Sequence, residues 1–155
     1  MQSDHIEVKR IGDAGTIVMN RPNHANALTR QMIAQMSEAL DDLYYERGVR
    51  SIVLTGAGDW FSAGLDLAES NAAAESERRE EMWGEEAADL RDLLVRMLEI
   101  TKPIIAAVNG PALSFGASLA AAADMVVAAD NALIGLPDAR DGLVAGLAAP
   151  LFNHS

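Results

Sequence analysis

Apolar residues along the chain follow two alternating spacings. Short strand-like runs occur at residues 6–10, 16–19, 51–55, 104–108 and 125–129, and the run at 104–108 is almost wholly apolar. Between these runs, apolar residues recur at helical spacing, first in a helix capped near Thr29 and again from about residue 82 to 101. Strands that alternate with helices in this way predict an α/β fold, arranged in layers around a largely parallel sheet.

The segments between these predicted strands and helices lead to three further expectations. The glycines of residues 12–15 lie between the first two strands and predict a hairpin. Residues 70–81 are rich in Ala, Glu and Arg and are expected to be exposed, mobile or both. Residues 131–135 are expected to form another short extended segment, which Pro137 and Asp138 end.

The most informative stretch of the chain is Lys102 to Asp138, and above all Pro103 to Ala120. A buried strand, 104–108, is broken by Asn109-Gly110-Pro111, and a helix of small residues begins near Gly116. The first N–H groups of such a helix, around Phe115 and Gly116, have no partner within it and point at the turn together with the positive end of its dipole. This geometry can bind an anion or an oxyanion.

Composition limits the classes of function. With 155 residues, half of them hydrophobic, the chain can bury the core of one domain. A net charge of −11 argues against binding to nucleic acid or to an anionic membrane. There is no cysteine, and the three histidines are scattered, so no disulfide and no metal site are expected. The first residues lack a secretory leader and no apolar stretch is long enough to span a bilayer, which predicts a cytoplasmic protein.

Three local features of the sequence can be interpreted either as functional sites or as ordinary turn, cap and packing residues. Gly56-Ala-Gly58 follows a strand, but Phe61 occupies the third glycine position of a dinucleotide fingerprint, so a plain turn is favoured. Ser114, between a strand and a helix, resembles a nucleophile elbow, yet the only histidine after it is His154. From spacing alone, Asp138 and Asp66 are best interpreted as cap or turn carboxylates and Ser118 as a packing residue.

Taken together, three stretches resemble the enoyl-CoA hydratase/isomerase (crotonase) superfamily. They are Asn20-Arg-Pro-x-x-x-Asn26-Ala-Leu28, Phe61-Ser-Ala-Gly-Leu-Asp-Leu67, and Lys102 to Leu113 continuing to Gly135-Leu-Pro-Asp138. The resemblance extends from about Ile6 to Gly146 and implies a crotonase-like fold of repeated β-β-α units. It also implies that residues 1–155 form a single core domain without the C-terminal helical part of the family.

The resemblance implies an acyl-CoA substrate and no other cofactor. Two backbone N–H groups, those of Leu65 and of Phe115 with Gly116 beside it, would bind the thioester oxygen and stabilise an enolate. The side that faces CoA would be lined by Arg21, Asn26, Ala27, Ala63, Gly64, Asp66 and Leu67. A homo-oligomer, a trimer or a hexamer, is expected.

The chain departs from the family at its two catalytic acids. Ser118 and Asp138 stand where family hydratases carry glutamates, which leaves Asp138 as the expected acid/base and favours a single-carboxylate proton shuttle typical of isomerases. Two alternatives stay open. One is a catalytically impaired protein that binds acyl-CoA or a partner, and the other is a serine hydrolase that uses Ser114.

Overall fold

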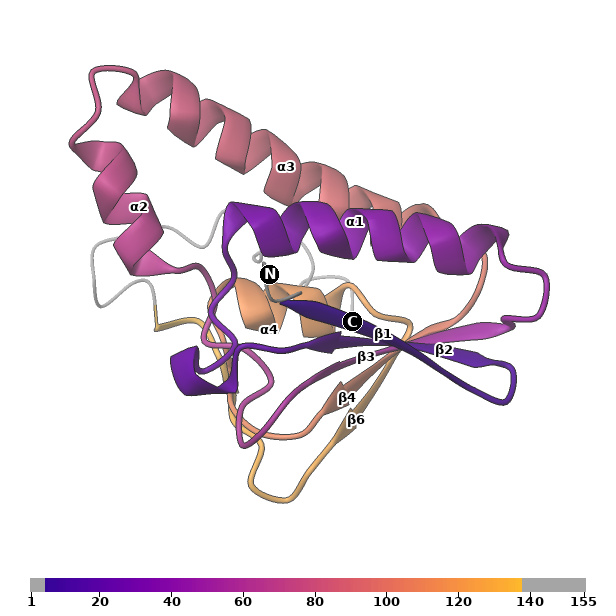
Figure 1. The fold of residues 1–155 in the computed structure, drawn as a ribbon. Helices are drawn as coiled ribbons and strands as arrows, with labels where there is room; N and C mark the ends of the chain where they lie inside the picture. Colours follow the sequence, from indigo (N-terminus) through magenta and orange to yellow (C-terminus); the bar gives the residue numbers. More distant parts are fainter. Residues whose placement is uncertain (1–4, 138–155) are drawn as a thin grey trace.

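The fold is built on a mixed sheet of five strands in a computed structural model that describes residues 5–137. Figure 1 shows how its helices and strands are arranged. The sheet order is β1-β2-β3-β4-β6, and β5 and β7 form a second, two-stranded sheet. The strands are β1 (Ile6–Ile11), β2 (Ala14–Met19), β3 (Ser51–Gly56), β4 (Ile104–Val108), β5 (Ala112–Leu113), β6 (Met125–Ala128) and β7 (Ile134–Gly135). The helices are η1 (Pro22–His24), α1 (Arg30–Tyr45), α2 (Leu67–Ala74), α3 (Arg79–Glu99) and α4 (Phe115–Ala121).

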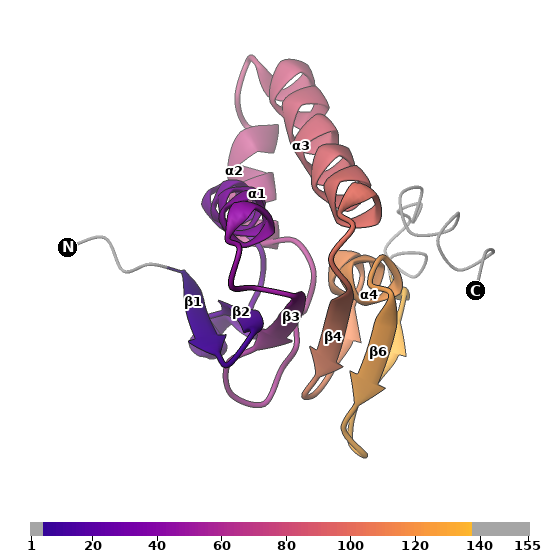
Figure 2. The same cartoon turned by 90° about the vertical axis from the view of Figure 1, so that its right-hand side faces the viewer.

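The predicted parallel sheet is confirmed. β1 and β2 form the expected antiparallel hairpin, whereas β2, β3, β4 and β6 all run parallel to their neighbours. Parallel neighbours need crossover connections, and α1 and α3 supply two of them. Figure 2 shows that α1 and α3 lie on the same side of the sheet. Because β2, β3, β4 and β6 run parallel to one another, their carboxyl ends lie at the same edge of the sheet.

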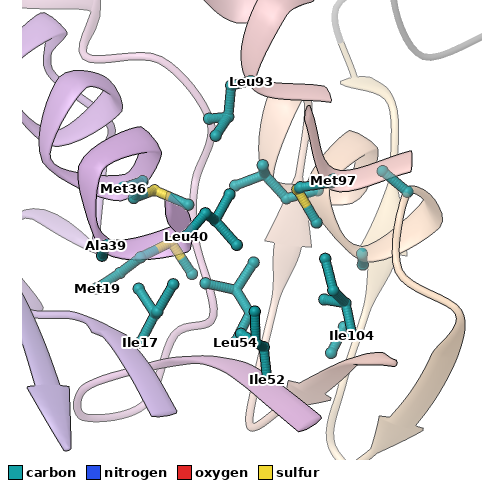
Figure 3. Close-up of a cluster of buried hydrophobic side chains, with 14 of the residues drawn as sticks. Ile17, Met19, Met36, Ala39, Leu40, Ile52, Leu54, Leu93, Met97 and Ile104 are labelled. Atoms are coloured by element: carbon teal, nitrogen blue, oxygen red, sulfur yellow. The ribbon is translucent and has the colours of Figure 1, made fainter. Parts of the chain in front are cut away.

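The core lies between the sheet and the α1 and α3 helices (Figure 3). The helix α1 begins where the sequence predicts, because the Thr29 side chain accepts a hydrogen bond of 3.2 Å from the Met32 N–H. Side chains at helical spacing on α1 and α3 meet those of the strands. The labelled members of this cluster are Ile17, Met19, Met36, Ala39, Leu40, Ile52, Leu54, Leu93, Met97 and Ile104.

Two segments differ from the sequence-based expectation. Residues 70–81 were expected to be exposed, mobile or both, and most of them are exposed, but α2 covers part of them and α3 begins at Arg79, three residues before the predicted start at 82. Short exposed helices of this kind bury few apolar residues and leave no amphipathic pattern to detect. The strand β5 was also missed, since a pair of residues is too short for an alternation to be recognised.

The strand β6 is exposed along its whole length. Met125, Val126 and Val127 are 59%, 46% and 59% exposed, although parallel strands usually have both faces covered. In the part of the chain that the structure describes, only β4 pairs with this strand. Within the same residues, no helix is long and apolar enough to cross a membrane.

Candidate active site

The segments that follow β3 and β4 lie side by side. Ser62 forms an isolated parallel bridge with Ala112. The Ser62 N–H donates to the Pro111 carbonyl at 3.2 Å, and the Ser62 carbonyl accepts from the Leu113 N–H at 2.9 Å. Both segments leave the carboxyl ends of parallel strands, the edge at which α/β proteins usually bind ligands.

Two glycines allow these segments to touch. A Cβ on Gly64 would lie 2.7 Å from the Ser114 Cβ and 3.1 Å from its Oγ, and Gly64 has a φ of +99°. A Cβ on Gly116 would lie 2.5 Å from the Ser62 carbonyl oxygen. Real Cβ contacts are essentially never shorter than 3.0 Å, so neither position accepts a side chain without a shift of its neighbour.

The N–H groups of Leu65 and Phe115 come directly after these contacts. The neighbours of Leu65 are both engaged, because the Gly64 carbonyl accepts from Leu28 at 2.7 Å and the Asp66 N–H donates to Leu28 at 2.9 Å. Within residues 5–137, neither the Leu65 N–H nor the Phe115 N–H donates to another residue. The fold thus leaves two backbone donors available at adjoining turns.

Ser114 has an unusual backbone conformation. Its φ of 53° and ψ of −123° lie in a region that residues other than glycine rarely adopt. The surroundings hold it there: its N–H donates to the Gly135 carbonyl at 2.9 Å, and its carbonyl accepts from Ala117 and Ser118 at 3.0 and 3.2 Å. Strain that is maintained by the neighbouring structure in this way is characteristic of functional sites.

Asn26 connects a second loop to the same region. Its side chain is fully buried, and the Oδ1 accepts from the Arg21 N–H at 2.9 Å. The Nδ2 donates to the carbonyls of Ala57 and Trp60 at 2.9 and 2.7 Å. Asn26 itself has a φ of 51°, which asparagine tolerates better than most residues. One buried amide therefore joins the segment after β2 to the loop after β3.

Arg21 and Asp66 form an ion pair that is mostly buried. The Arg21 guanidinium lies 2.9 Å from Asp66 Oδ2, with the two side chains 13% and 15% exposed, and it also donates to the Ala27 carbonyl at 2.6 Å. Burial alone would raise the pKa of Asp66. The hydrogen bond from Arg21, the N–H groups of Glu69 and Ala68 and the charge of Arg21 outweigh it and lower that pKa. Asp66 is therefore ionised and neutralises the charge of Arg21.

The other predicted residues have varied surroundings. The Ala63 N–H donates to Ala25 at 2.9 Å, whereas Leu67, the first residue of α2, is 65% exposed. Ser118 is 2% exposed within α4, and its hydroxyl donates to the Ser114 carbonyl at 3.4 Å. Asp138, the predicted acid/base, lies outside the described residues.

Ser62 and Asn109 also organise the site, and the sequence did not single them out. The Ser62 hydroxyl is fully buried, donates to the Asn26 carbonyl at 2.9 Å and accepts from the Gly64 N–H at 3.1 Å. Asn109 Oδ1 accepts from the Gly56 N–H at 3.1 Å, and its Nδ2 donates to Gly58 at 2.8 Å. Single polar residues within loops follow no periodicity, so only their position in the motifs could have pointed to them.

A model of the family described as "Enoyl-CoA hydratase/isomerase" matches residues 12–153. The chain belongs to the enoyl-CoA hydratase/isomerase family. The carnitinyl-CoA dehydratase of Escherichia coli strain K12 is 38% identical over 144 residues, which are 92% of this chain and 52% of that enzyme. The enoyl-CoA hydratase EchA19 of Mycobacterium tuberculosis is 34% identical over 133 residues, which are 86% of this chain and 49% of that protein.

Solved structures agree with this assignment to the hydratase/isomerase family. An enoyl-CoA hydratase/isomerase from Mycobacterium paratuberculosis superposes with a TM-score of 0.84 at 32% identity, over 94% of this chain and 57% of that one. The predicted crotonase-like α/β fold is thereby confirmed. The chain spans about half the length of the curated relatives that it matches. In the described part of the chain, no three His, Cys, Asp or Glu side chains cluster closely enough to hold a metal ion.

Proposed function

We propose that this chain acts on an acyl-CoA as an enzyme of the enoyl-CoA hydratase/isomerase type, which stabilises a thioester enolate with backbone N–H groups. The observation that carries the proposal is the contact between Gly64 and Ser114. It brings together two turns whose next N–H groups, those of Leu65 and Phe115, have no acceptor among the described residues. Membership of the family supports the acyl-CoA as substrate.

The thioester oxygen would accept from both of these N–H groups. As a proton leaves the carbon next to the thioester, negative charge develops on this oxygen, and donors held in place stabilise that charge without rearranging. One such donor contributes on the order of 3 kcal/mol to the transition state. Phe61 and Phe115, next to these turns in the sequence, are 0% and 6% exposed.

Asp138 would take and return the proton. In the sequence, Asp138 stands at the position of one family glutamate and Ser118 at the position of the other. A buried serine hydroxyl bonded to the helix backbone is a poor base, so one carboxylate would have to serve both transfers. Movement of a double bond needs only such a shuttle, and isomerisation is therefore favoured over hydration.

The loops around Asn26 would hold the CoA side. Arg21, Asn26, Ala27, Ala63, Gly64, Asp66 and Leu67 are the residues that the family motifs assign to it. Because Asp66 neutralises Arg21, this pair would position the loop rather than offer a free cation to the phosphates. No cofactor other than the CoA of the substrate is required by this chemistry.

A second candidate is a protein that binds acyl-CoA without turnover. The position of Ser118 favours it, since a hydroxyl directed at the Ser114 carbonyl offers no acid where hydratases have one. The two candidates share the ligand and differ in catalysis, so one activity assay separates them.

The test is incubation with crotonyl-CoA and with a 3-enoyl-CoA, followed by chromatography of the products. We expect migration of the double bond, and a loss of about 100-fold or more in the Asp138→Asn variant. The matched control is Asp130→Asn, because Asp130 is an exposed carboxylate near β6. Binding of both thioesters without any product would reject the enzyme and leave the binding protein.

A further inference from the structure

Ser114 carries a hydroxyl that the enolate chemistry does not use. It is half-buried and lies between the strand β5 and the helix α4. In the proposed reaction, this turn contributes the N–H of the next residue, Phe115, and not the Ser114 side chain. The hydroxyl therefore has no role in that reaction, although it stands beside the proposed oxygen site.

The backbone around Ser114 has the form of a nucleophile elbow. In such an elbow a serine occupies a sharp, strained turn between a strand and a helix, which lifts its Oγ clear of the backbone. Leu113 ends β5, Ser114 takes a φ of 53° and a ψ of −123°, and Phe115 begins α4. The sequence pattern alone suggested this motif, and the strained conformation is an independent observation in its favour.

The oxyanion donors that accompany a nucleophile elbow also have counterparts in this protein. They are the N–H of the residue after the nucleophile and an N–H from a neighbouring loop. Here these are the N–H groups of Phe115 and Leu65. The Ser114 side chain faces the second loop, since its Oγ lies only 3.1 Å from where a Cβ on Gly64 would be. An acyl carbon whose oxygen is held by both donors would then lie next to this Oγ.

We infer that Ser114 is a nucleophile that gives the protein a second activity, the hydrolysis of acyl-CoA thioesters through an acyl-serine. The Oγ forms an ester bond to the acyl carbon while the bond from that carbon to sulfur breaks. The electron pair of the broken bond leaves with sulfur, which takes the hydroxyl proton and departs as the CoA thiol. Water then cleaves the ester, giving the carboxylic acid and restoring the hydroxyl.

This inference rests on the proposed function for its substrate and for its oxygen site. The decisive variant is Ser114→Gly, because glycine adopts a positive φ without strain and keeps the Phe115 N–H in place. The variant removes the Ser114 hydroxymethyl group, and its melting temperature checks that the fold is retained. Ser37→Ala is the matched control, since the Ser37 hydroxyl bonds the Ile33 carbonyl within α1, away from both turns.

The experiment measures thiol release from butyryl-CoA, a saturated thioester that neither hydration nor isomerisation consumes. We expect release by the unchanged protein and by Ser37→Ala, and a fall of about 100-fold or more in Ser114→Gly. Mass spectrometry of protein quenched during turnover should find the butyryl group on the peptide that contains Ser114.

Two results would overturn the inference. The first is equal thiol release by Ser114→Gly and the unchanged protein, and the second is no release at all. The enoyl-CoA assay on the same samples distinguishes the two proposals. If the unchanged protein moves the double bond but releases no thiol, only the nucleophile is rejected, whereas absence of both activities in the unchanged protein would reject the enzyme as well.

Discussion

Replacing Gly64 by alanine should slow catalysis about 100-fold by separating the two turns. The new Cβ would lie 2.7 Å from the Ser114 Cβ, whereas ordinary contacts begin at 3.4 Å. The turns must therefore move apart by the difference between these values, 0.7 Å, or rotate by an equivalent amount. The neighbouring atoms at 3.1 Å, the Leu113 carbonyl oxygen and the Ser114 Oγ, leave no easy direction for this movement.

The size of the effect follows from the geometry. A misplacement of about 1 Å in an active site can cost about 100-fold in rate. Complete loss of one backbone donor would cost on the order of 3 kcal/mol, which also corresponds to about 100-fold. We therefore expect kcat/KM to fall by roughly that factor, with most of the loss in kcat, because the donors act mainly on the transition state.

The effect of backbone strain in Gly64→Ala must be separated from the effect of moving the two N–H donors. Gly64 has a φ of +99°, so an alanine there also strains the backbone. Gly12→Ala is the matched control, since Gly12 has a φ of +64° and nothing lies within 4 Å of its hypothetical Cβ. Both variants should lower the melting temperature, and only Gly64→Ala should lose turnover of the enoyl-CoA substrates.

One outcome would refute this reasoning. If Gly64→Ala stayed folded and turned over substrate within about threefold of Gly12→Ala, the contact between the turns would not hold the donors in place. The proposed oxygen site between Leu65 and Phe115 would then have to be abandoned.

Two further predictions concern stability and assembly. Since the pKa of Asp66 is lowered in the folded protein, its stabilisation is complete above the unfolded pKa of about 3.9 and is lost as pH falls through the folded value. Urea unfolding should therefore show Asp66→Asn destabilised by about 1–2 kcal/mol at pH 7 and by less in acid, and an equal deficit at both pH values would contradict this. We also propose that the chain forms a homo-oligomer through the exposed strand β6. Chromatography should then give a multiple of 16.5 kDa that Val127→Lys reduces to one chain and Val95→Lys, on α3, does not. A monomer before any substitution would reject the proposal.

The spacing of apolar residues was enough to predict most of the fold. It placed α1, β3 and β4 and the parallel order of the sheet, because burial imposes a period of two on strands and of 3.6 on helices. It did not predict α2 or the strand β5, which are short and bury little. The family motifs supplied the positions of Leu65, Phe115 and Asn26, which periodicity could not distinguish from ordinary loop residues.

Only the tertiary structure decided which of these residues meet. Gly64 and Ser114 are fifty positions apart in the printed sequence, and no local pattern indicates that they touch. Their contact depends on the pairing of β3 with β4, which brings the carboxyl ends of two distant strands to one edge. The strained turn at Ser114, the buried hydrogen bonds of Ser62 and the neutralised charge of Arg21 likewise arise from neighbours distant in sequence. Amino-acid types determined the elements, and the packing of those elements determined the site.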